Sequence, residues 1–567
     1  MRLFSRVRAV VRGLLRPERV TPQRALMGHF LRQFFQGGDA AAAETSMVRA
    51  LAGVAAPMLI TAFWIVTLAG ALRGWGAAGV HYLFVLYAFC AMGCVTTLQW
   101  ERLFPERMDF LVLLPMPLRG WTIFAAKLRA VAVLLLLFLF AANVFGTLLL
   151  PVLAGRRLPV AMFAHAVAVF AAGAASALGV LALESLVVAM VPERLFRYVA
   201  PVVQAVLVSA FLVLFLRMGI VTESLPVLLS GQSDVGRWFP PLWFLAVYEV
   251  CLGGPAATPY AYMLAREAWL CLPVLLVCAV SLYPAAWARR QRMALEGTRS
   301  AELRDGRVWA GLVHGTVLRT TDGRAVFHFM RQSLARLSRY HVGLAAYAGA
   351  GVALSLTAAF RVEVLGDSLR VSLIQTGAQV VLPLLLFWMV AGLKTAFSLP
   401  ADLGARWVFR LAGLQTQRVI STAKLFVFGG CCALIVMLLL ALAACGWRGV
   451  ELWLQGVYGV ICAVLLIDVF FYLEAHVPFT RPPLPGRSSL PMTLATYIFG
   501  VPVLILLMIT LEHWAGTHVW RVAEAVGAAV AVHGLMHWLR GLPSHPASAD
   551  VFLDEFTEEI QTLGLSA

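Results

Sequence analysis

The chain has 567 residues, of which 61% are hydrophobic and 13% are charged, and its mean hydropathy is +0.84. This charge is too little to cover the surface of a water-soluble protein of such length, so the composition excludes that class. The sequence predicts an all-α polytopic membrane protein embedded in a lipid bilayer.

The net charge of +16 is concentrated in two segments. Residues 1–49 hold nine arginines and three acidic residues, and residues 289–340 hold eleven arginines and four acidic residues. Basic segments beside apolar spans are typical of cytoplasmic loops, so membrane orientation explains the charge and a nucleic acid partner is the weaker alternative. The nine cysteines contain no CxxC pair, and we expect neither disulfide bonds nor a metal site.

Residues 1–49 are expected to form an N-terminal amphipathic region on the membrane surface. Over residues 3–15, apolar side chains fall on one arc of a helix and arginines on the other. Thr21 and Pro22 are a favourable N-cap and first-turn pair for a second helix that continues to Phe35. Helices with one basic and one apolar face lie in the headgroup plane.

Twelve apolar runs are long enough to cross a bilayer. They are residues 50–72, 79–99, 130–154, 160–191, 198–216, 268–288, 341–360, 371–393, 425–446, 452–473, 490–511 and 517–539. They predict two six-span halves, residues 50–289 and 341–540, joined by a basic cytoplasmic linker at residues 290–340. Residues 219–267 are expected to form short external elements, and residues 541–567 an acidic cytoplasmic tail.

A short similarity links the two halves. The chain has three lysines, Lys127, Lys394 and Lys424. Lys127 and Lys424 each lie in an AKL sequence that opens a third span, 22 residues after Pro105 and 24 residues after Pro400 respectively. The correspondence predicts a duplicated six-span unit.

Common catalytic signatures are missing from the sequence. No lysine follows a glycine, so the phosphate-binding GxxxxGK[ST] loop cannot occur. HExxH, GxSxG and CxxC are absent as well. We therefore expect neither enzymatic activity nor a bound cofactor in this chain.

Glu184 and Asp468 are the acidic residues expected inside spans, the fourth span of each half. Intramembrane acids are costly and mark ion or substrate paths by default. Pairing with Arg194 or Arg481 near the cytoplasmic ends is the favoured interpretation.

His533 and His537 are four residues apart in the last span, which is metal-ligand spacing on one helix face. No acidic third ligand is near them in the sequence, so we favour interfacial histidines.

The segment between the second and third spans carries more charge than a connection needs. Five charges within nine residues are followed by FLVLLPMPL, which is too short to cross a bilayer and contains two prolines. An ordinary surface loop is the alternative. An apolar anchor beside charges that set orientation is typical of a docking element. The expected docking residues are Glu101, Glu106, Arg107, Asp109, Phe110, Leu111, Leu113, Arg119 and Lys127.

The amphipathic N-terminus, the six spans and the surface segment ending in LVLLPMPLRGWTIFAAKL resemble the permease subunits of ABC-2 type ABC exporters. The resemblance implies an elbow helix and a coupling helix that docks on a separate ATPase subunit, present in two copies, which binds the ATP. It implies export of a hydrophobic or amphiphilic substrate across a bacterial-type cytoplasmic membrane, with both termini inside. In the second half the corresponding residues are Asp402, Arg406 and Lys424, without paired prolines, and we expect weaker coupling there.

Two other functions stay open at this point. A secondary transporter would use Glu184 and Asp468 as ion-coupling groups. A membrane-embedded lipid-modifying enzyme would use His533 and His537.

Overall fold

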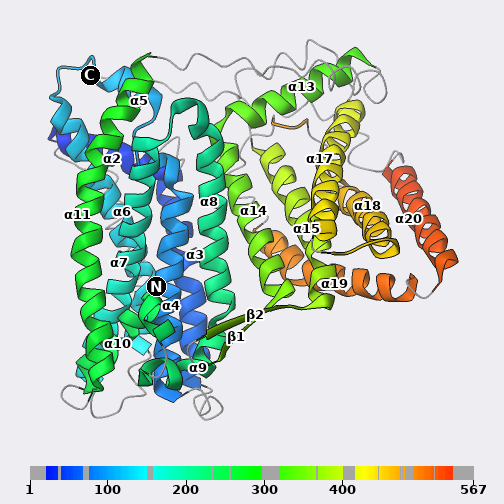
Figure 1. Cartoon of the computed structure of the whole chain (residues 1–567). Helices are drawn as coiled ribbons and strands as arrows, with labels where there is room; N and C mark the ends of the chain where they lie inside the picture. The colour runs from blue at the N-terminus through cyan, green and yellow to red at the C-terminus, as the bar shows by residue number, and fades with distance from the viewer. Residues whose placement is uncertain are drawn as a thin grey trace. The chain divides into compact units, whose positions relative to one another are not determined.

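The computed structural model describes residues 21–540 with several gaps, and Figure 1 traces their arrangement. The gaps are residues 36–39, 68–75, 150–157, 232–233, 254–256, 297–319, 366–367, 400–415, 445, 473, 475–476, 480–489 and 516–517. Within the described residues, eleven helices are long and apolar enough to cross a membrane, and one two-stranded hairpin is present. The all-α polytopic membrane fold is therefore confirmed.

Three expected features lie outside the described residues. They are the amphipathic helix at residues 3–15, the second-half segment with Asp402 and Arg406, and the acidic tail at residues 541–567. Each of them stays a prediction.

The chain divides into two compact units. The first unit comprises Met1–Glu302 and His341–Val381, and the second comprises Leu303–Tyr340 and Leu382–Ala567. The expected seventh span thus groups with the first unit.

This seventh span is α14 (Ser338–Ala359), and its contacts with α8 (Glu193–Leu216) explain the grouping. Gly349 lies so close to α8 that an added Cβ would approach a backbone oxygen of that helix to 2.8 Å. Arg217, directly after α8, donates a 2.7 Å hydrogen bond to the carbonyl of Thr357. A close glycine contact and an arginine on the last carbonyls hold α14 to the first unit.

In the first unit, α7 (Leu158–Met190) packs against α4, α10 and α11. Buried alanines recur every three or four residues along it, at Ala161, Ala164, Ala168, Ala172 and Ala175. Small residues at this spacing let neighbouring helices approach closely. The other long helices of the unit are α3 (Ala40–Thr67), α4 (Gly76–Leu98), α6 (Gly120–Leu149) and α11 (Pro259–Glu296).

The expected second amphipathic helix is α2 (Pro22–Phe34). Thr21 is extended and Pro22 occupies the first turn, as a fixed proline φ favours. Its apolar side, including Phe30 and Phe34, is buried against the unit and it packs on α6. The helix is therefore present where the sequence predicts it, and its position on the membrane surface stays a prediction.

Residues 218–253 form short helices, as expected, but residues 259–267 already belong to α11, so the sixth span begins earlier than the predicted residue 268. The short helices are α9 (Met218–Ser230), the 3₁₀ helix η4 (Asp234–Trp238) and α10 (Pro240–Gly253). In Figure 1, α9 and α10 lie at the end of the first unit opposite to α2 and α5.

The hairpin was not expected. Strand β1 (Phe360–Leu365) pairs antiparallel with β2 (Ser368–Leu373), with Val362 opposite Val371. The expected eighth span, from residue 371, therefore begins later, as α15 (Gln375–Ser398). Alternating β-branched and charged residues favour a strand here over a helix.

The second unit contains the remaining helices. They are α13 (Thr321–Arg336), α15, α17 (Thr416–Ala444), α18 (Val450–Phe471), α19 (Leu490–Ala515) and α20 (Val519–Arg540). α19 has 26 residues and coincides with the expected span at 490–511; the part of it whose side chains are described is the apolar stretch Phe499–Trp514.

Candidate functional site

The segment between α4 and α6 forms two short helices at one end of the first unit. The 3₁₀ helix η2 (Trp100–Arg102) and Pro105 precede α5 (Arg107–Leu113), and Pro115 and Pro117 follow it. The backbone N–H of Glu106, the N-cap, donates a 2.9 Å hydrogen bond to Asp109 Oδ2. This capping interaction fixes where α5 begins.

Asp109 also joins α5 to α2. Gln33 Nε2 donates a 2.6 Å hydrogen bond to Asp109 Oδ1, and His29 Nε2 lies 3.2 Å from the same oxygen. Burial alone would raise the pKa of Asp109, but these bonds, the N–H of Glu106 and the charge of Lys127 favour the carboxylate and hold the pKa below its ordinary value. The carboxylate expected to face a partner is thus used inside the chain.

The loop around η2 is anchored as well. The Arg102 guanidinium donates to the carbonyl of Phe34 in α2, and burial lowers the pKa of Arg102. Phe104 stacks on Tyr283 of α11 with ring centroids 4.8 Å apart, and the Tyr283 hydroxyl donates a 2.8 Å hydrogen bond to the carbonyl of Leu103. The segment around η2 is therefore attached to both α2 and α11, so a displacement of the segment would be transmitted to both helices.

The apolar anchor expected in α5 is divided between two faces. Phe110 and Leu113 are buried, and the Phe110 ring lies edge-on to Trp287 of α11 at 5.4 Å. They hold α5 to its own chain and are not available to a partner. The outer face of α5, by contrast, is exposed and consists of Met108 (64%), Leu111 (41%) and Val112 (51%).

The charged residues of the segment between α4 and α6 also differ in their exposure to solvent. Glu106, Arg107 and Arg119 are exposed beside the outer face, whereas Glu101 is half-buried in η2. Docking of a partner stays the predicted role of Glu106, Arg107 and Arg119.

Lys127, in the second turn of α6, is only 1% exposed. Its Nζ lies 4.7 Å from the ring centroid of Phe30 and 4.8 Å from that of Phe34, both in α2. A cation between two aromatic faces is attracted by their quadrupoles. Lys127 therefore joins α6 to α2 and cannot contact an external partner in this conformation.

Glu184 of α7 is completely buried, and neither carboxylate oxygen has a hydrogen-bond partner among the described residues. The charges that act on it are Arg290 of α11 and Glu101 of η2. Its charged neighbour among the described side chains is thus Arg290, which sequence spacing did not indicate; the expected partner Arg194 has a side chain outside the described ones, so that pairing stays a prediction.

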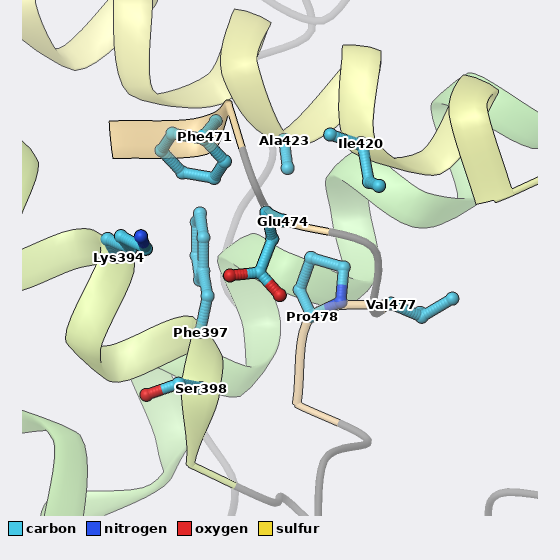
Figure 2. Close-up of a pocket in the computed structure, with 9 residues that line it drawn as sticks. All are labelled: Lys394, Phe397, Ser398, Ile420, Ala423, Phe471, Glu474, Val477 and Pro478. Atoms are coloured by element: carbon cyan, nitrogen blue, oxygen red, sulfur yellow. The ribbon is translucent and has the colours of Figure 1, made fainter. Parts of the chain in front are cut away.

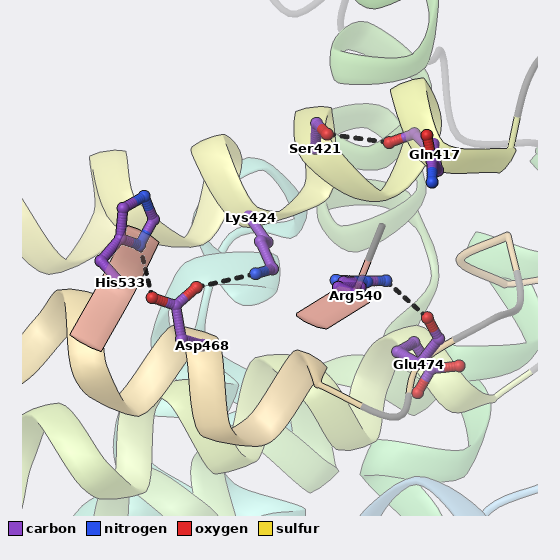
Figure 3. Close-up of polar contacts among 7 residues, drawn as sticks. All are labelled: Gln417, Ser421, Lys424, Asp468, Glu474, His533 and Arg540. Carbon is purple, nitrogen blue, oxygen red and sulfur yellow. Dashed lines mark hydrogen bonds and ion pairs between the residues drawn. The ribbon is translucent and has the colours of Figure 1, made fainter. Parts of the chain in front are cut away.

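The second unit contains a polar cluster around the buried carboxylate of Asp468, drawn in Figure 3. Asp468 of α18 accepts a 2.8 Å bond from Lys424 Nζ of α17, and its other oxygen lies 2.5 Å from His533 Nδ1 of α20. To their right in the view, the Arg540 guanidinium donates a 2.6 Å hydrogen bond to the carbonyl of Glu474. Asp468 therefore contacts Lys424 and His533, whereas the expected partner Arg481 lies outside the described residues.

A small pocket lies beside this cluster (Figure 2). Phe397, Glu474 and Pro478 border it, and Lys394 lies across from Glu474. Its volume of about 10 Å³ is at the lower limit for a single water molecule. This pocket is too small for a transported substrate.

His533 and His537 do not form a metal site with other residues that the structure describes. His533 contacts Asp468, His537 is exposed, and no group of three His, Cys, Asp or Glu side chains in the described ranges could hold a metal ion.

Sequence reasoning missed the partners of the segment. His29 and Gln33 are four residues apart in α2, and this i, i+4 pair of polar residues on an amphipathic helix was the available signal. Trp287 and Arg290 come from the end of α11, about 180 residues away from α5, and no local pattern indicates them.

Comparison of the chain with known protein families, curated proteins and solved structures gave no match.

Proposed function

We propose that this chain is the permease subunit of an ATP-driven exporter of the ABC-2 type, which moves a hydrophobic or amphiphilic substrate. A separate ATPase subunit, in two copies, binds ATP and docks on the outer face of α5. The basic segments at residues 1–49 and 289–340 support a cytoplasmic location for this end of the first unit and for both termini, in a bacterial-type cell.

The observation that carries the proposal is the division of α5 into two faces. Its inner face and Asp109 are bound to α2 and α11, so the helix is held rigidly. Its outer face leaves three apolar side chains exposed among Glu106, Arg107 and Arg119. Apolar anchors within a charged rim are typical of protein interfaces.

The direct test replaces the outer face and leaves the inner face unchanged. A chain with Met108→Ser, Leu111→Ser and Val112→Ser should insert and unfold as wild type does, because these side chains make no core contact. It should no longer retain the P-loop ATPase encoded beside it when the two are co-purified in mild detergent.

A matched control uses three exposed apolar residues on the membrane-facing side of α6, Leu136, Phe140 and Leu148. Serine at these positions should leave ATPase retention intact. Equal retention by the α5 variant and wild type would contradict the proposal.

A second candidate function is an ion-coupled secondary transporter. It is favoured by the carboxylate of Glu184, which has no hydrogen-bond partner among the described residues. Such a protein would transport its substrate with a proton gradient and no ATPase. Proton-driven uptake into vesicles that contain this chain alone, abolished by Glu184→Gln, would support it.

A further inference from the structure

A groove of about 260 Å³ opens between α5, the start of α6 and the end of α11. It lies on the inner side of α5, away from the outer face. Four aromatic rings surround it in a connected series, in which neighbouring centroids are 5.1 to 5.4 Å apart: Trp121, Phe124, Trp287 and Phe110. The groove is therefore apolar and preformed.

Three exposed arginines are next to this groove in the chain. Arg119 adjoins the lining residue Gly120, Arg292 adjoins the lining residue Gln291, and Arg107 begins α5. No ion pair is found for them with any residue that the structure describes. One exposed acid, Glu106, adjoins the lining residue Pro105, and the acid of the lining, Asp109, is bound by Gln33 and His29, so the net charge of these residues is positive.

The position of the groove identifies the kind of molecule that fits. α6 and α11 both have the length and apolarity of membrane spans, and the groove lies where α6 begins and α11 ends. Trp121 is 73% exposed at the same level, and exposed tryptophans beside spans are typical of the headgroup region. Basic pockets between spans at this level bind anionic lipid headgroups.

We propose that this groove binds one anionic phospholipid from the surrounding bilayer. An acyl chain lies against the aromatic rings, and Arg119 and Arg292, with Arg107, contact the phosphate of the headgroup. Arg107 and Arg119 also belong to the charged rim of the outer face, but the groove itself is lined from the opposite side of α5, and lipid binding measured without an ATPase tests this proposal separately from the docking.

The test uses the full chain, purified in a neutral detergent and stripped of lipid. Native mass spectrometry would count the phosphatidylglycerol or phosphatidylcholine molecules retained, with the same acyl chains in both lipids. Wild type should retain one phosphatidylglycerol in preference to phosphatidylcholine. Each lost arginine should lower the phosphatidylglycerol affinity about five-fold, so Arg119→Gln with Arg292→Gln should remove the preference.

Two further variants separate the contributions. Gly120→Leu places a side chain at the groove where an added Cβ meets nothing within 4 Å, so the fold should tolerate it while affinity for both lipids falls. Arg197→Gln, an exposed arginine at the start of α8, is the matched control and should change neither. Thermal unfolding of each variant checks that it is folded.

Equal affinity of wild type for the two lipids would overturn the proposal. So would phosphatidylglycerol retention that is unchanged in the double arginine variant. A Gly120→Leu chain that changes its oligomeric state and keeps its lipid would assign the groove to a second copy instead.

Discussion

Lys127 in the first unit and Lys424 in the second each begin a span in the same AKL sequence, yet their ammonium groups have different surroundings. Lys127 lies between two phenylalanines of α2, and the buried acid of its unit, Glu184, has Arg290 as its charged neighbour. Lys424 binds the buried acid of its unit, Asp468, directly.

The difference indicates a division of labour between the units. In the second unit, Asp468 of α18 contacts both Lys424 of α17 and His533 of α20, and these contacts join the three helices. In the first unit the lysine instead lies against α2, which also binds Asp109 and thereby holds α5. In the second unit the surface helix α13 is attached to α17 by other side chains, such as Phe327 with Phe426, and Lys424 has no part in that contact.

The largest expected effect is on the attachment of α5 in the first unit. Phe110→Ala removes a buried ring that packs on Trp287, and should lower the free energy of unfolding by about 4 kcal/mol. Chemical unfolding in detergent measures it. Val112→Ala on the outer face should change stability by less than about 0.5 kcal/mol; similar losses for both would mean that α5 does not have two distinct faces.

Lys424→Met should destabilise the second unit by about 3 kcal/mol, because it leaves the Asp468 carboxylate buried with His533 as its one described partner. Thermal unfolding of the purified chain measures the loss. Adding Asp468→Leu should restore most of it, since an apolar pair can replace a buried ion pair. A double variant no more stable than the single one would argue against a direct pair.

Asp109→Asn should weaken the attachment of α5 to α2 by about 2 kcal/mol, because hydrogen bonds to a charged acceptor are lost. The pKa of Asp109 is depressed in the folded chain, so its contribution is complete above the unfolded carboxyl pKa and is lost as pH falls below about 4. Hydrogen exchange of α5 amides between pH 7 and pH 3 measures this. Exchange protection that declines equally in wild type and variant would exclude Asp109 as the titrating group.

Lys127→Met should have the smallest effect, a loss of about 1 kcal/mol, because it removes a cation–π contact and breaks no hydrogen-bonded ion pair. The same thermal unfolding that is used for Lys424→Met gives the comparison. If the two methionine variants are equally unstable, the lysines have equivalent roles and the proposed difference between the units is wrong.

Much of the fold followed from the sequence. Long apolar runs bounded by charge predict spans reliably, because the bilayer leaves few alternatives to a helix. Thr21 and Pro22 predicted the start of α2 from local chemistry alone. The sequence also contains a signal for the hairpin, because two runs of alternating apolar and polar residues flank Gly366 and Asp367, a favourable hairpin dipeptide.

The candidate site was less predictable, because its geometry depends on contacts between distant segments. The composition of FLVLLPMPL indicated an apolar docking element, but not that Phe110 faces Trp287 while Leu111 faces outward. Likewise, the sequence identified Asp468 and His533 separately, and only the fold brings them together with Lys424.

The most direct test of the docking account is photo-crosslinking from single positions in α5. A photoreactive amino acid at Leu111, on the outer face, should crosslink the permease to its ATPase subunit when the two are expressed together. The same probe at Phe140, an exposed position on α6, should give no such product. The account predicts that the ATPase is crosslinked from Leu111 and not from Phe140. Absence of the crosslinked product from all three outer-face positions, Met108, Leu111 and Val112, would contradict it.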